Sequence, residues 1–168
     1  IASFRRRRSN IRPESLEQRA RICEATGIDE AEMPFAGELI DVPAEHAQWR
    51  AAAERVLRPL STALLVPGEH MPAVTRYLSE TNLRGFLRCI DVSIPVDGPS
   101  EPGPRDLITK LSTYDSAMGD WVARKITAHY DFECVENPDE LAKVSRGVSL
   151  GGAVKRNSST TEKDDRHT

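Results

Sequence analysis

Short apolar runs alternate with amphipathic segments in the first half of the chain. Three runs, at residues 35–42, 63–66 and 86–92, are short and rich in branched apolar residues, as β-strands are. A proline or glycine stands beside each run, where the missing N–H of proline or the free dihedrals of glycine interrupt regular structure. The pattern predicts one strand in each run.

The two segments between these strands have a helical period instead. Their apolar residues recur every three or four positions, which places them on one face of a helix. They are Trp49, Ala53, Val56 and Leu60 in the first segment, and Met71, Val74, Tyr77 and Leu78 in the second. The order strand–helix–strand–helix–strand predicts a βαβαβ unit with parallel neighbours and helices packed on the sheet.

The flanking segments extend this unit. A helix is predicted from Pro13, whose fixed φ suits a first helical turn, to Gly27, which suits a left-handed cap. Residues 93–105 are rich in proline and glycine and predict a loop. A fourth strand is predicted near residues 132–135. The sequence therefore indicates an α/β fold, with a mixed sheet built around the βαβαβ unit and helices packed on it.

Two local patterns give more specific expectations. Trp49 and Trp121 each lie on the apolar stripe of a predicted helix, so both side chains are expected to be largely buried. Gly151 and Gly152 separate two short apolar segments, which is a hairpin signal.

Polarity divides the chain into three parts. We expect a basic lead-in over residues 1–12, a globular domain over residues 13–156 and a polar exit segment over residues 157–168. Because the sequence opens at Ile1 without an initiator methionine, we expect it to be a piece of a longer polypeptide.

The net charge of -3 gives no general case for binding nucleic acid. Four consecutive arginines nevertheless stand near the start of the chain: Arg5, Arg6, Arg7 and Arg8. Such a run can contact phosphates, or it can be the solvated, charged end of a helix or linker. Both interpretations remain open.

Cysteine usage and hydropathy limit the compartment. Cys23, Cys89 and Cys134 are odd in number and far apart, which predicts free thiols in a reducing environment. No apolar run is long enough to span a bilayer, and no signal-peptide pattern opens the chain. We expect a cytoplasmic protein without a membrane partner.

Acidic residues at strand ends are the strongest sign of an enzyme. Asp41 and Asp91 end two predicted strands, and Glu38 lies on the first. Carboxylates gathered at the carboxyl ends of strands can hold Mg²⁺ for phosphoryl chemistry, or they can be ordinary strand-edge groups. The four histidines lack metal-ligand spacing, and no other cofactor is expected.

Five phrases carry a family resemblance. They are RRRSNI at 6–11, PFAGELIDV at 34–42, LLVPGEH at 64–70, LRG at 83–85 and EKDDRH at 162–167. Their order and spacing resemble the central region of the SMC-like ATPases of bacterial Wadjet-type plasmid-defence systems, the JetC or EptC family, which are relatives of MukB. The resemblance covers nearly the whole chain.

The resemblance implies the hinge of an SMC-like ATPase, a domain that pairs two protomers where long coiled-coil arms meet. The ATPase head would lie elsewhere in the parent protein, so this piece would be neither an enzyme nor a cofactor binder. The resemblance also implies condensin-like accessory subunits, association with the nucleoid and action on plasmid DNA. A small Mg²⁺-dependent α/β enzyme and a nucleic-acid-binding domain that uses the arginine run are the alternatives.

A hinge needs a persistent, two-fold symmetric interface. The favoured segment is 148–154, because its short strands follow the main core and lack an obvious internal partner. Its proposed contact residues are Val148, Leu150, Gly151, Gly152 and Val154.

Overall fold

The computed structural model describes residues 11–166. Its helices are α2 (Pro13–Thr26), α3 (Arg50–Ser61), α4 (Met71–Glu80) and α5 (Ala117–His129). Its strands are β1 (Ile40–Asp41), β2 (Leu64–Val66), β3 (Cys89–Asp91), β4 (Ser112–Thr113), β5 (Glu133–Val135), β6 (Gly147–Ser149), β7 (Val154–Asn157) and β8 (Thr160–Glu162). Short 3₁₀ helices connect several of them: Glu30–Glu32, Ala36–Leu39, Ala44–Trp49, Gly68–His70, Leu107–Lys110 and Pro138–Lys143.

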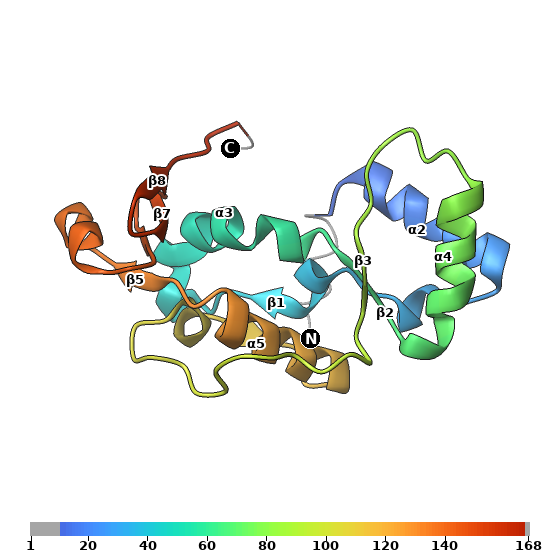
Figure 1. Ribbon diagram of the computed structural model, residues 1–168, viewed down its shortest axis with the longest axis horizontal. Helices are drawn as coiled ribbons and strands as arrows, with labels where there is room; N and C mark the ends of the chain where they lie inside the picture. The colour runs from blue at the N-terminus through green and yellow to red at the C-terminus, as the bar shows by residue number, and fades with distance from the viewer. Residues whose placement is uncertain (1–10, 167–168) are drawn as a thin grey trace.

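The described strands form three small sheets. β1 pairs with β4 in antiparallel orientation, β2 pairs with β3 in parallel, and β5, β6, β7 and β8 form a mixed four-stranded sheet in that order. Figure 1 shows the four-stranded sheet at one end of the molecule and α2 and α4 at the other, with α3 and α5 between them. The predicted class, helices packed on a mixed sheet, is confirmed.

The predicted strand pairing is only partly correct. β2, α4 and β3 form the expected parallel βαβ unit. The run at residues 35–42, however, mostly forms the 3₁₀ helix Ala36–Leu39, and the strand that follows pairs with β4 rather than β2. The physical cause is local: Glu38 Oε1 accepts a hydrogen bond from the Phe35 backbone N–H at 2.8 Å and closes the turn. The fourth predicted strand, β5, belongs to the other sheet.

The C-terminal part contains more regular structure than its polarity suggests. β6 and β7 form the predicted hairpin around the two glycines. β7 then pairs with β8, so that residues 160–162 of the expected exit segment are a strand of the sheet.

Two of the three apolar clusters of the described residues meet at β2; the third is a small cluster of Val135, Leu141 and Val144. The larger core lies among α3, α5 and the four-stranded sheet, and the smaller core lies among α2, α4 and β2. Side chains alternate along a strand, and here Leu65 enters the larger core whereas Leu64 and Val66 enter the smaller one. All three are fully buried.

The two tryptophans differ in burial. Trp49 is 2% exposed and belongs to the larger core, as predicted. Trp121 is only half-buried against that core, and its indole N–H lies 3.4 Å from the carbonyl oxygen of Ile94 in the proline-rich loop. That loop covers one side of α5 and leaves the indole edge near solvent.

Helix α2 begins and ends as predicted. Pro13 occupies its first turn, and Gly27 follows it with φ of 77°. The Gly27 N–H donates to the Cys23 carbonyl at 2.8 Å, which satisfies one of the free carbonyls at the helix end. In the part of the chain that is described, no helix combines the length and apolar character needed to cross a membrane.

Replacing each tryptophan with alanine should lower stability by different amounts, because the two indoles differ in burial. Trp49→Ala should lower the free energy of unfolding by about 3–5 kcal/mol, because it leaves a large cavity in the core. Trp121→Ala should cost clearly less, since part of its indole already contacts water. Urea denaturation followed by far-UV circular dichroism measures both values; equal losses would contradict the different burial of the two rings.

Candidate functional site

The carboxylates of the predicted magnesium site are not brought together. Asp41 lies on β1 and Asp91 on β3, in different sheets. Asp91 Oδ1 accepts hydrogen bonds from the Ser93 backbone N–H and hydroxyl at 2.9 and 2.5 Å. Glu38 is bound to Arg19 at 2.5 Å. Within residues 11–166 these groups do not form a metal-ligand cluster, so the site on which the enzyme alternative depends is not formed.

Another acidic cluster is present at the surface. Glu32, Glu69 and His70 place ligand atoms within 4.8 Å of one another, and His70 Nε2 lies 3.1 Å from Glu32 Oε1. Sequence spacing could not show this cluster, because Glu32 comes from a different turn. Both glutamates are exposed, and the short His–Glu contact accounts for the grouping as a surface pair.

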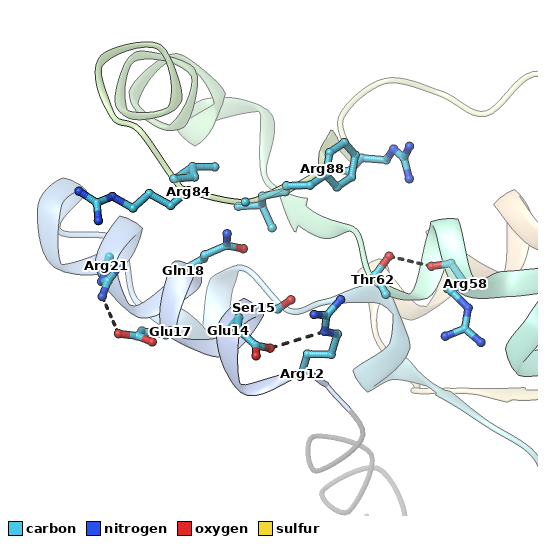
Figure 2. Close-up of a pocket in the computed structure, with 14 residues that line it drawn as sticks. Arg12, Glu14, Ser15, Glu17, Gln18, Arg21, Arg58, Thr62, Arg84 and Arg88 are labelled. Carbon is cyan, nitrogen blue, oxygen red and sulfur yellow. Dashed lines mark hydrogen bonds and ion pairs between the residues drawn. The ribbon is translucent and has the colours of Figure 1, made fainter. Parts of the chain in front are cut away.

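A groove of about 460 Å³ lies between α2 and residues 83–88. Figure 2 shows Ser15 and Gln18 pointing from the helix into the space beneath the 83–88 segment. Thr62 and Arg58, from the end of α3, close the groove on one side. Five arginines and two glutamates line it: Arg12, Arg21, Arg58, Arg84, Arg88, Glu14 and Glu17.

The charges of the groove do not cancel. Arg12 pairs with Glu14 at 3.5 Å and Arg21 with Glu17 at 2.5 Å, both on exposed side chains. The three remaining arginines, Arg58, Arg84 and Arg88, form no ion pair within the described residues. The lining therefore carries an excess of positive charge that attracts anions.

Local backbone geometry exposes the 83–88 segment. The Arg84 N–H donates to Asn82 Oδ1 at 3.0 Å, and Arg84 itself has φ of 55°, in the left-handed region. After this turn, Leu87 packs against the smaller core while the Phe86 ring points outward and is 74% exposed. The Arg88 guanidinium lies 5.3 Å from the centre of that ring and donates to the Pro59 carbonyl at 3.1 Å.

The predicted arginine run can be placed only in part. Arg5, Arg6, Arg7 and Arg8 lie outside the described residues. Arg12, the next basic residue along the chain, lines the groove. Sequence reasoning found this N-terminal cluster but missed the groove, because the three unpaired arginines are dispersed over residues 58–88.

The predicted interface segment 148–154 is largely internal. Val148 and Val154 are 0% and 3% exposed and pack in the larger core of the protomer. Leu150 is half-buried and Gly151 is exposed. The pairing of β6 with β5 and β7 supplies the internal partners that the sequence did not reveal. Of the named residues, Leu150 and Gly151 offer surface to a second molecule.

Strand edges offer another surface. One side of β5 is covered, since the Cys134 N–H donates to the Arg105 carbonyl at 2.8 Å. β3, in contrast, has β2 as its single strand partner within residues 11–166. Phe86 and Ile94, 74% and 60% exposed, flank β3 on its two ends. An unpaired edge beside exposed apolar side chains is suited to association with another chain.

All three cysteines are free, as predicted. Burial raises the pKa of Cys134 to about 12 and that of Cys89 to about 11. Burial also raises the pKa of Cys23, with a further contribution from the Glu30 carboxylate. Thiols with such raised pKa values are poor nucleophiles at neutral pH, so none is suited to catalysis.

Comparison with solved structures identifies the fold. The Pyrococcus furiosus SMC protein hinge domain superposes with a TM-score of 0.64 at 17% identity, covering 98% of this chain and 90% of that one. The Geobacillus stearothermophilus SMC hinge domain, solved as an asymmetric dimer, gives a TM-score of 0.56 at 18% identity. The match covers 99% of this chain and 79% of that one. The predicted SMC-like hinge fold is confirmed.

A longer solved structure shows the same similarity. The Pyrococcus furiosus Smc hinge domain with an extended coiled coil matches with a TM-score of 0.60 at 20% identity, over 76% of this chain. The present chain spans about half (47%) of that longer molecule. No protein-family model and no curated protein matches the sequence.

The raised thiol pKa predicts an alkaline loss of stability. Above the ordinary pKa of 9.0, Cys134 ionises first in the unfolded chain, so the free energy of unfolding falls as pH rises from 9 towards about 12. Well inside that window the free energy of unfolding should fall by about 1.4 kcal/mol per pH unit from this thiol alone, which is the slope for a difference of one bound proton between the two states. Urea denaturation at a series of pH values measures it. The matched variant Cys134→Ala should have a shallower slope, and an unchanged slope would contradict the assignment.

Proposed function

We propose that this chain is the homodimerisation hinge of an SMC-like protein. The similarity to SMC hinge domains over almost the entire chain is the observation that carries the proposal. In this role the chain holds two protomers together and performs no chemistry itself. The separation of the predicted carboxylates is consistent with such a role.

We further propose that the parent protein is an SMC-like ATPase of the Wadjet type. The five sequence phrases named above support this narrower assignment, and the hinge fold agrees with it. The ATPase head, the coiled-coil arms and the contacts with condensin-like subunits would lie elsewhere in the parent protein. The expected setting is the bacterial nucleoid, and the expected target is plasmid DNA.

The open edge of β3 is the surface that best supports pairing. It combines a strand whose single strand partner within residues 11–166 is β2 with the exposed side chains of Phe86 and Ile94. A second copy can extend the sheet along such an edge. The segment 148–154 remains the second candidate, through Leu150 and Gly151. A durable interface should bury on the order of 1,200–2,000 Å² in total.

The basic groove is the surface that best supports contact with DNA. Arg58, Arg84 and Arg88, which form no ion pair within residues 11–166, provide separate positive charges for phosphates, and Arg12 also lines the groove. The N-terminal run of Arg5, Arg6, Arg7 and Arg8 would add to this charge. Such contacts bind the backbone and do not read sequence.

Pairing is tested by mass in solution. The wild-type chain should have twice its protomer mass of 18.7 kDa by size-exclusion chromatography with light scattering. The double substitution Phe86→Lys and Ile94→Lys should give a folded monomer, because both side chains are exposed and the protomer core is untouched. Leu150→Lys is the comparison variant: dissociation by it alone would move the interface to residues 148–154. A wild-type monomer at high concentration would refute the hinge.

DNA binding is tested by its salt dependence. A labelled duplex followed by fluorescence anisotropy should bind with an affinity that falls steeply with salt. Arg58→Gln together with Arg84→Gln should reduce the slope of log affinity against log salt by about 1.8, or 0.9 for each lost phosphate contact.

Arg76→Gln is the matched control for this measurement, since Arg76 is exposed on α4 and does not line the groove. Replacing Arg5, Arg6, Arg7 and Arg8 with glutamine tests the N-terminal run in the same assay. If neither the groove double variant nor the N-terminal quadruple variant changes the slope of log affinity against log salt, phosphate contacts at these arginines are excluded.

A further inference from the structure

Arg55 connects helix α3 to the end of the described chain. Its side chain is only 11% exposed. Nε donates to the Asp164 carbonyl at 3.1 Å, and one terminal nitrogen donates to Asp165 Oδ1 at 2.8 Å. Both partners follow β8, more than a hundred residues later in the sequence. One guanidinium therefore fixes the course of residues 163–166 across α3.

The same guanidinium occupies the space beside Gly152. This glycine has φ of 90°, and a Cβ at its position would lie 2.8 Å from Arg55 Cζ and 3.0 Å from Arg55 Cδ. Even if another residue adopted this φ, its side chain would displace the Arg55 guanidinium. Gly151, in the same turn, has Ser149 Oγ as its nearest atom at 3.9 Å and leaves room for a methyl group.

The turn and the exit segment are already linked through the sheet, where Val154 of β7 pairs with Glu162 of β8, and Arg55 forms a second link from outside the sheet. The turn is closed by the Gly152 N–H donating to the Ser149 carbonyl at 2.9 Å, and it joins β6 to β7. The exit segment follows β8, on the far side of β7. Arg55 comes from α3, outside this sheet, and it contacts both. A cavity of about 130 Å³ beside Arg55, lined also by Arg156 and Asp164, gives the guanidinium space to shift.

The ionic half of the contact is stable at neutral pH. Asp165 is paired with Lys163 at 3.0 Å as well as with Arg55. The hydrogen bond from Lys163, followed by that from Arg55, lowers the pKa of the Asp165 carboxyl. The contact therefore remains charged near neutral pH but is weakened by salt, since Asp165 is exposed.

We propose that Arg55 is a joint that couples the direction of residues 163–166 to the conformation of the Gly151–Gly152 turn. A change at either end must move the guanidinium and is transmitted to the other end. The coupling lies within one protomer. The functional role of this coupling rests on the proposed function, in which a coiled-coil arm follows this chain. Movement of that arm would then change the conformation of the 148–154 segment through Arg55.

The test measures backbone order at one end while the other end is changed. In ¹⁵N relaxation experiments on the whole 168-residue chain, Gly152→Ala should lower the order parameters of residues 163–166 from about 0.85 to below about 0.6. Arg55→Gln should loosen residues 163–166 and also speed hydrogen exchange at the turn. Asp165→Asn should speed hydrogen exchange at the Gly151–Gly152 turn, although the substituted residue is not part of that turn.

Two controls make the result specific. Gly151→Ala changes the same turn without touching Arg55, and Arg76→Gln removes a positive charge far from the joint; neither should alter residues 163–166. In an Arg55→Ala background the added Gly152→Ala should have no further effect on residues 163–166, because the coupling group is absent.

Order at residues 163–166 that is unchanged in Gly152→Ala, or equally reduced in Gly151→Ala, would overturn the proposal. If Gly152→Ala does not fold, the exchange rates at the turn in Asp165→Asn decide it: unchanged rates would overturn the joint. The oligomeric state of the same samples is a separate result. A monomer with intact coupling would refute the hinge and leave the joint standing.

Discussion

The buried guanidinium of Arg19 holds the N-terminal half of the structure in place. It lies 2.5 Å from Glu38 Oε1, 3.4 Å from Glu30 Oε1 and 5.0 Å from the centre of the Phe35 ring, with 4% of its side chain exposed. Because a buried charge is costly unless it is paired, these contacts must form together. They fix α2 against the 3₁₀ helix Ala36–Leu39, which in turn presents Phe35 to β2 through an isolated β-bridge with Leu64.

Much of the fold was predictable because its signals are local. The caps of α2 at Pro13 and Gly27, the burial of Trp49 and the hairpin at the two glycines all follow from residue chemistry within a few positions. The pairing of β1 with β4 was not predictable. It depends on a long-range partner, and the apolar run before β1 is diverted into a 3₁₀ helix by the side chain of Glu38.

The candidate sites show the same division. Arg5, Arg6, Arg7 and Arg8 are adjacent in the sequence and were recognised, whereas Arg58, Arg84 and Arg88 meet only after α3 and the 83–88 segment are placed. Asp41 and Asp91 ended predicted strands, but the strands belong to different sheets. Val148 and Val154 looked unpartnered because β8 lies in a polar segment, and because the pairing of β6 with the predicted strand β5 is a long-range contact that the sequence does not show.

The alternating side chains of β2 have a consequence for how the protein comes apart. Leu65 belongs to one core, while Leu64 and Val66 belong to the other, and all three are fully buried. If either core unfolds, one face of β2 is exposed to water, and β2 also contributes side chains to the other core. The domain should therefore behave as one cooperative unit rather than two foldons that open separately. A load applied to either end is then resisted by the whole domain.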